Sequence, residues 1–235
     1  MSPLISAHRG SCGVPGLPAA ERYRRAIELG VDYVELDVRR TLDGLYVNYH
    51  DHVTPSGRPT AGLSYAALKD ELGGELLLLD ELFDVVAGRV GMHIDLKESG
   101  YEPEIMQMVL GRATVDRFVV TTGDVDSIRT IKDGFPTVRA GLTLGTDMKG
   151  AQAWVTLRER LAELFPGPRL KRSHADFVAA HEQLARLRLL RYCARRGLAC
   201  WVWTVDEERE IARFMADERV TTLITNRPEI ALRLR

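Results

Sequence analysis

Two carboxylates, Glu35 and Asp37, stand one residue apart in the otherwise apolar segment 33–38. Alternate residues of a strand point to the same side, so both acids share one face and the apolar residues share the other. Neighbouring carboxylates repel each other and lose hydration unless positive charge lies beside them, and oxygen ligands of this kind suit Mg²⁺ or Ca²⁺. The alternative is a solvent-facing edge strand, on which two acids need no partner.

The strands and helices that would position this pair alternate along the chain. Apolar runs and turn residues predict strands at 4–7, 33–38, 45–49, 90–96, 118–122, 139–144, 175–178, 199–203 and 221–224, with helices at 19–29, 64–72, 79–86, 103–110, from 124, 151–165, 183–196, 207–215 and from 228. Eight βα units can be counted if the least regular strand, 175–178, is accepted. We therefore predict an α/β fold, a (β/α)8 or TIM barrel, as a single domain over residues 1–235. A doubly wound open sheet is the alternative, but no glycine-rich phosphate turn follows the first strand.

Composition narrows the class of protein. The chain has 235 residues, is 45% hydrophobic and has a formal net charge of -1, which gives no basic field for nucleic acid. No apolar run is long enough to span a membrane, and segment 1–5 lacks the features of a secretory signal. The three cysteines, Cys12, Cys193 and Cys200, have no metal-binding spacing. These features predict a cytoplasmic protein.

Polar residues interrupt the predicted strands mainly at their carboxyl ends, where barrel enzymes carry their chemistry. They are His8, Arg9, Glu35, Asp37, His50, Asp95, Lys97, Thr121, Thr122, Thr143, Trp203, Thr204 and Asn226. Two histidines, three carboxylates, an arginine and a lysine supply a general acid, a general base, cation ligands and groups that hold an anion. Ordinary polar loop starts would not require this combination.

Several of these residues lie in recognisable motifs. The motifs are His8-Arg9-Gly10, Glu35-x-Asp37-Val38, Thr41-x-Asp43-Gly44, His50-Asp51, Trp201-Val202-Trp203-Thr204-Val205-Asp206 and Leu223-Ile224-Thr225-Asn226-Arg227-Pro228. In their order and spacing the chain resembles the glycerophosphodiester phosphodiesterase family, and the resemblance spans its whole length. The run from residue 8 to residue 51 is the most specific part.

The resemblance implies a metal-dependent phosphoric diester hydrolase. His8 and His50 match the acid/base pair of the family, in which related enzymes attack with a neighbouring hydroxyl of the substrate and pass through a cyclic phosphate. Glu35, Asp37 and Asp95 match the ligands of one divalent cation, Mg²⁺ or Ca²⁺. The chemistry is consistent, since imidazoles titrate near neutrality and a cation opposes the charge that develops on the phosphate.

The resemblance also implies how the substrate is held. Arg9 and Lys97 would face the phosphate, and Trp203 would wall the pocket near the leaving group. The expected partner is a small-molecule or lysolipid phosphodiester rather than nucleic acid, and the oligomeric state stays open.

Three departures from the family pattern bear on activity and substrate. Residues 16–19, Gly-Leu-Pro-Ala, stand where the family has Pro-Glu-Asn-Thr, and Asp95 replaces a glutamate. Thr121 and Thr122 replace Ser-Phe and predict a smaller, more polar wall. Sphingomyelinase D, a related barrel, also has aspartate as its third ligand, which favours a lysolipid-like or sphingolipid-like substrate. The alternative is a catalytically impaired barrel that binds a phosphorylated ligand.

Four further residues have a functional and a structural interpretation. His52 would be an alternative base, His93 would support the metal ligands, His181 would touch a head group, and Cys12 would be a reactive thiol. For each of them we favour the structural interpretation, as a solvated loop residue or a hydrogen-bonded strand residue.

Overall fold

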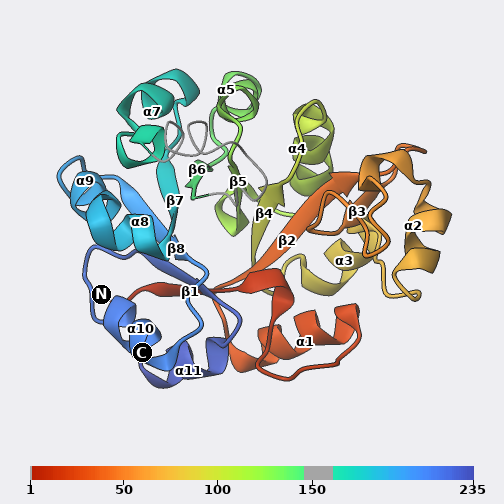
Figure 1. The fold of residues 1–235 in the computed structure, drawn as a ribbon, viewed down its shortest axis with the longest axis horizontal. Helices are drawn as coiled ribbons and strands as arrows, with labels where there is room; N and C mark the ends of the chain where they lie inside the picture. The colour runs from red at the N-terminus through yellow and green to blue at the C-terminus, as the bar shows by residue number, and fades with distance from the viewer. Residues whose placement is uncertain (1, 146–160) are drawn as a thin grey trace.

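The computed structural model describes residues 2–145 and 161–235, and its centre is a closed ring of parallel strands (Figure 1). Around the ring the order is β1 (Leu4–Ala7), β9 (Thr222–Thr225), β8 (Ala199–Trp203), β7 (Phe177–His181), β6 (Ala140–Leu144), β5 (Phe118–Thr122), β4 (Gly91–Leu96) and β2 (Tyr33–Arg40). Pairing of β1 with β2 closes the ring. The predicted (β/α)8 barrel is confirmed, and the open sheet is excluded by this closure.

Helices surround the ring (Figure 1). They are α1 (Ala19–Leu29), α2 (Tyr65–Glu71), α3 (Leu79–Val86), α4 (Glu102–Leu110), α5 (Val125–Gly134), α7 (Gly167–Ser173), α8 (Glu182–Leu184), α9 (Leu190–Ala194), α10 (Glu208–Met215) and α11 (Pro228–Arg233). The prediction at 124 is confirmed, since the Asp124 carboxylate accepts hydrogen bonds from Asp126 N and Ser127 N at the start of α5.

Several boundaries differ from the prediction. The strand expected at 175–178 is β7, which begins two residues later, and helix α7 before it was not predicted. The single helix expected at 183–196 is divided by a π-helical turn, Ala185–Leu189, between α8 and α9. Most of the helix expected at 151–165 lies outside the described residues.

One short strand lies outside the ring. Strand β3 (Tyr46–Asn48) pairs antiparallel with the end of β2, and α2 and α3 follow it (Figure 1). Strand β3 and α2 pack on a separate apolar cluster, which includes Val47, Leu63, Leu68 and Leu76, whereas the buried side chains of α3 belong to the main core. The segment that contains His50 follows β3 and lies beside β2, since Tyr49 N donates to Asp37 O at 3.0 Å.

The first and last strands are neighbours. Leu4 N donates to Thr221 O at 2.9 Å, Arg235 forms an ion pair with Asp32, and both chain ends lie beside α10 and α11 in Figure 1. Within the described parts of the chain, no helix is both long and apolar enough to cross a lipid bilayer.

Candidate active site

The acidic pair lies inside the barrel. Val34, Leu36 and Val38 pack in the apolar layer between strands and helices, so Glu35 and Asp37 point the other way, as the alternation predicted. Both acids are buried, at 6% and 3% exposure, and the interpretation as a solvent-facing edge strand is therefore wrong.

Asp95 joins this pair from the neighbouring strand. It lies opposite Asp37 in the parallel register of β2 and β4, and it is also buried. One oxygen from each of Glu35, Asp37 and Asp95 lies within 4.8 Å of the others. We call these three residues the acidic cluster.

Two cationic side chains contact the acidic cluster. Lys97 Nζ lies 2.9 Å from Asp37 Oδ1 and donates a short hydrogen bond to Asp95 Oδ2. Arg9 Nε lies 3.4 Å from Asp37 Oδ2, and the Arg9 backbone N donates to Glu35 Oε2 at 3.1 Å. If all are ionised, three carboxylates face two cations, and one negative charge remains uncompensated.

The pKa shifts follow from this crowding. Burial, followed by the negative charge of Asp37, raises the pKa of Glu35. Burial acts in the same direction on Asp37, but Lys97, His50 and Arg9 together outweigh it and lower the Asp37 pKa. Burial opposes ionisation of Lys97, yet Asp95 and Asp37 raise its pKa above the ordinary value.

The acidic cluster fits a divalent cation. Its donors are carboxylate oxygens alone, the set preferred by Mg²⁺ and Ca²⁺. Asp37 Oδ1 is buried and lies 2.9 Å from the Lys97 ammonium without a hydrogen bond of good geometry, so this oxygen could serve as a ligand atom. Glu35, Asp37 and Asp95 are therefore the residues that could hold such an ion.

A tight turn after β1 places His8 and Arg9 against the acidic cluster. Arg9 has φ 52° and Gly10 has φ 66°, both in the left-handed region. A Cβ on Gly10 would lie 2.7 Å from the ring of Tyr23, whose hydroxyl donates to Glu35 O at 2.8 Å. Only glycine fits between this turn and that ring.

The His8 imidazole bridges the acidic cluster and the last strand. His8 Nε2 lies 3.6 Å from Glu35 Oε2, and Nδ1 lies 2.9 Å from Asn226 Oδ1. Burial and the positive charge of Arg9 lower the pKa of His8 to about 4, so the ring is neutral at pH 7.

His50 follows β3, and hydrogen bonds to the backbone of residues 49 and 50 hold this segment against β2. Arg39 Nε donates to His50 O at 3.0 Å, and Tyr49 N donates to Asp37 O at 3.0 Å. His50 Nδ1 lies 2.7 Å from Asp51 Oδ1. Burial and the positive charge of Lys97 lower the His50 pKa, which the carboxylates of Asp37 and Asp51 partly offset.

His93 lies beneath the acidic cluster in a buried hydrogen-bond chain. Thr121 Oγ1 donates to Asp95 Oδ1 at 2.6 Å, so it accepts from His93 Nε2 at 2.7 Å, and Ser6 Oγ lies 3.4 Å from His93 Nδ1. Thr121 and Thr122, at 1% and 3% exposure, lie in the interior rather than on an open pocket wall. Because His93 is fully enclosed, burial lowers its pKa to about 4.

Trp203 and His181 lie together at the ends of β8 and β7. Their rings meet edge to face with centroids 5.3 Å apart, and Trp203 Nε1 donates to Ala179 O at 3.0 Å. The indole N–H is therefore occupied, and Trp203 can offer a ligand its apolar ring surface.

The free thiol of Cys12 is buried, and His52 is exposed.

Two polar partners were not predicted from the sequence. Asp206 accepts hydrogen bonds from the backbone and the side chain of Asn226, and Asn226 in turn contacts His8. Glu75 accepts from Ala19 N at 3.1 Å and supplies the cap that the Gly-Leu-Pro-Ala segment lacks at the start of α1. Asp206 and Asn226 belong to recognisable motifs, but nothing in the sequence indicated that they pair.

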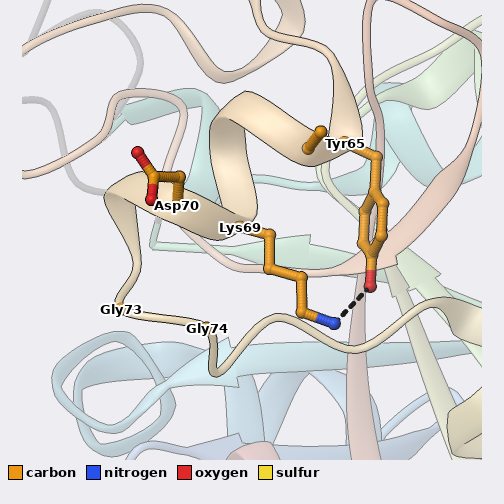
Figure 2. A pocket seen from close by; sticks show the side chains of 6 residues that line it. Tyr65, Lys69, Asp70, Gly73 and Gly74 are labelled. Atoms are coloured by element: carbon orange, nitrogen blue, oxygen red, sulfur yellow. Dashed lines mark hydrogen bonds between the residues drawn. The ribbon is translucent and has the colours of Figure 1, made fainter.

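A separate hollow of about 450 Å³ lies on α2, shown in Figure 2. It is lined by Tyr65, Ala66, Lys69, Asp70, Gly73 and Gly74. Lys69 Nζ donates to Tyr65 Oη at 3.1 Å, as the dashed line in Figure 2 marks. The hollow shares no residue with the acidic cluster.

Comparison with known proteins matches this architecture. The model of the glycerophosphoryl diester phosphodiesterase family matches residues 8–77 and 83–230. A glycerophosphodiester phosphodiesterase of Caldanaerobacter subterraneus subsp. tengcongensis is 26% identical over 258 residues, covering 100% of this chain and 98% of that protein.

Solved structures share the fold at lower sequence identity. The glycerophosphodiester phosphodiesterase of Thermotoga maritima superposes with a TM-score of 0.72 at 20% identity, covering 100% of this chain and 99% of that one. A phosphodiesterase of Oleispira antarctica, solved with the product sn-glycerol-3-phosphate, has a TM-score of 0.74 at 17% identity, covering 99% and 96%.

Proposed function

This chain belongs to the glycerophosphoryl diester phosphodiesterase family, and from that premise we propose how its barrel rim cleaves a phosphodiester. The chain is a phosphoric diester hydrolase, and its substrate is a glycerophosphodiester, which it converts to an alcohol and a glycerol phosphate. The observation that carries the proposal is the acidic cluster, whose ligand oxygens lie within 4.8 Å of one another beside His8, Arg9 and Lys97.

Glu35, Asp37 and Asp95 would hold one divalent cation, Mg²⁺ or Ca²⁺. When bound, such an ion supplies positive charge opposite the non-bridging oxygens of the phosphate. Lys97 and Arg9 add their own positive charges from fixed positions beside Asp37, so the phosphate meets cationic groups before reaction begins.

We assign His8 as general base and His50 as general acid. His8 is buried and neutral, because burial and Arg9 lower its pKa to about 4, and a neutral imidazole can accept a proton. His50 is more exposed than His8, and its contact with the Asp51 carboxylate partly offsets the burial and the Lys97 charge that lower its pKa, so it is the histidine we assign to proton donation. His8 would take the proton of the glycerol hydroxyl next to the phosphate, and His50 would protonate the departing alcohol.

Trp203 would present its ring surface to the leaving group, because its N–H is already bonded to Ala179 O. A lysophospholipid, which has the same phosphodiester and a longer apolar chain, is a second substrate of the same class.

The three free, buried thiols are compatible with a reducing compartment such as the cytoplasm.

Activity on a panel of glycerophosphodiesters and lysophospholipids tests the proposal. Purified protein should release the alcohol in the presence of Mg²⁺ or Ca²⁺ and stop when a chelator is added. Phosphorus NMR of the product distinguishes a glycerol phosphate from a cyclic phosphate. Calorimetric binding of these compounds without turnover would instead support a barrel that only binds a phosphorylated ligand.

A further inference from the structure

The Asn226 side chain connects His8 to Asp206. These residues follow β9, β1 and β8, which are adjacent strands of the ring. Asn226 Oδ1 lies 2.9 Å from His8 Nδ1 and accepts a hydrogen bond from Ser11 Oγ at 3.0 Å. On its other side, Asn226 Nδ2 donates to Asp206 Oδ2 at 2.7 Å.

Asp206 determines which way the Asn226 amide points. A carboxylate can only accept hydrogen bonds, and Asp206 Oδ1 is already engaged by Asn226 N at 2.8 Å. The amide nitrogen must therefore face Asp206 Oδ2, and the amide oxygen must face His8. If the amide were rotated, the Asn226 oxygen would lie 2.7 Å from Asp206 Oδ2, and the Asn226 NH2 group would face His8 Nδ1.

The orientation of the amide determines the tautomer of His8. A neutral imidazole carries one N–H, and Nδ1 faces an oxygen that can only accept. The proton therefore resides on Nδ1, and Nε2 keeps its lone pair. That nitrogen lies on the side of the acidic cluster, 3.6 Å from Glu35 Oε2 and beyond hydrogen-bond distance.

We propose that Asp206 and Asn226 are positioning residues, which keep the proton of neutral His8 on Nδ1 and leave Nε2 free to act as the base. The direction of proton transfer rests on the proposed function, whereas the tautomer can be measured without turnover. Because the same hydrogen bond to Nδ1 also holds the ring in place, Asp206 and Asn226 set both the orientation and the protonation of the His8 imidazole.

With His8 protonated on Nδ1, every proton moved in the two steps of the reaction can be accounted for. The substrate hydroxyl loses its proton to His8 Nε2 as its oxygen bonds to phosphorus, and the bond from phosphorus to the alcohol oxygen breaks as His50 protonates that oxygen. Water then opens the cyclic phosphate, giving its proton to His50 while His8 returns a proton to the glycerol oxygen. Both imidazoles regain their starting states, and Nδ1 keeps its proton throughout.

Heteronuclear NMR of the full chain with isotope-labelled histidine tests the tautomer directly. At about pH 8, where imidazoles are neutral, the His8 signal, assigned by its loss in His8→Ala, should show a protonated Nδ1. Asn226→Leu and Asp206→Ala should convert it to a mixture or to the Nε2-protonated form. A wild-type ring protonated on Nε2, or an unchanged signal in both variants, would overturn the proposal.

Kinetics with an exchange variant provide the second measurement. Asn226→Leu should lower kcat about 100-fold with little change in KM. The double variant Asp206→Asn, Asn226→Asp exchanges donor and acceptor and still offers an oxygen to Nδ1, so it should recover about tenfold over Asn226→Leu. If Asn226→Leu does not fold, Asp206→Ala and the exchange variant carry the test.

The matched control is Asp133→Asn, which removes an exposed carboxylate that pairs with Arg129 on α5 and should leave kcat unchanged. Wild-type kcat in both Asn226→Leu and Asp206→Ala would contradict the positioning role. Absence of turnover in the wild type on every phosphodiester would remove the proposed function, whereas the NMR measurement would still decide the tautomer.

Discussion

Lys97 Nζ lies 2.9 Å from Asp37 Oδ1 and donates a hydrogen bond to Asp95 Oδ2. One ammonium therefore contacts two members of the acidic cluster. This geometry makes Lys97 both a structural counter-ion and a candidate phosphate ligand, and these two roles can be separated by experiment.

Lys97→Met should destabilise the fold and abolish activity. Removing one partner from a buried ion pair leaves uncompensated carboxylates, and we expect the free energy of unfolding to fall by about 3 to 5 kcal/mol. Urea denaturation at neutral pH measures this, with the exposed Lys171→Met as control. Unfolding free energies within error of the wild type would show that the acids are neutralised in another way.

A divalent cation should stabilise the protein through the acidic cluster. A ligand that binds only the folded state adds about 2.7 kcal/mol at one hundred times its dissociation constant. Titration of Mg²⁺ or Ca²⁺ should therefore raise Tm in the wild type, with a smaller rise in Asp37→Asn and Asp95→Asn. Equal rises in all three proteins would place the ion elsewhere.

The two histidines should respond differently to the leaving group. His8→Ala and His50→Ala should each lower kcat about 10²- to 10⁴-fold on a glycerophosphodiester of a simple alcohol. On a nitrophenyl ester, whose leaving group needs no proton, the His50→Ala defect should largely disappear and the His8→Ala defect should persist. His52→Ala, in an exposed loop position, should match the wild type on both substrates.

Stability should fall in mild acid through His93. Its pKa is about 4 in the folded chain and 6.5 in the unfolded chain, so between these values the unfolded state binds more protons. This contribution is complete above pH 6.5 and is lost as the pH falls toward 4, by roughly 3 kcal/mol in total. Denaturation of chelated protein across this window measures the slope, which His93→Gln should reduce and the exposed His52→Gln should not.

Gly10→Ala should disturb the turn that carries His8. The substitution forces a side chain into the left-handed region and against the Tyr23 ring, for about 2 to 6 kcal/mol in all. Gly16→Ala is the matched control, because Gly16 has φ 74° with open space around its Cβ position. The difference in unfolding free energy between the two variants isolates the contact with Tyr23, and equal losses would mean that the ring moves aside.

Much of this architecture could be predicted because, in a barrel, the alternation of residues along a strand determines which side chains point inward. The alternation around Glu35 and Asp37 predicted their common face, and the parallel register then brings Asp95 opposite Asp37. The sequence does not show contacts between segments distant along the chain. The pairing of Asp206 with Asn226, and the cap that Glu75 gives to α1, both depend on such contacts.

Local signals also failed where they were weak or mixed. Helix α7 has seven residues and begins at prolines, so no apolar period reveals it. The π-helical turn Ala185–Leu189 adds a residue within an otherwise regular apolar pattern, which periodicity averages away. Thr121 resembled a wall residue from its place at a strand end, whereas its hydroxyl joins His93 to Asp95 in the interior.

The adjacency of β1 and β9 has a consequence during synthesis. His8 and its partner Asn226 are more than two hundred residues apart, so Asn226 is synthesised long after His8. A nascent chain that has already formed the acidic cluster cannot yet orient its imidazole. Pairing of β9 with β1 is therefore what brings the His8 imidazole its hydrogen-bond partner.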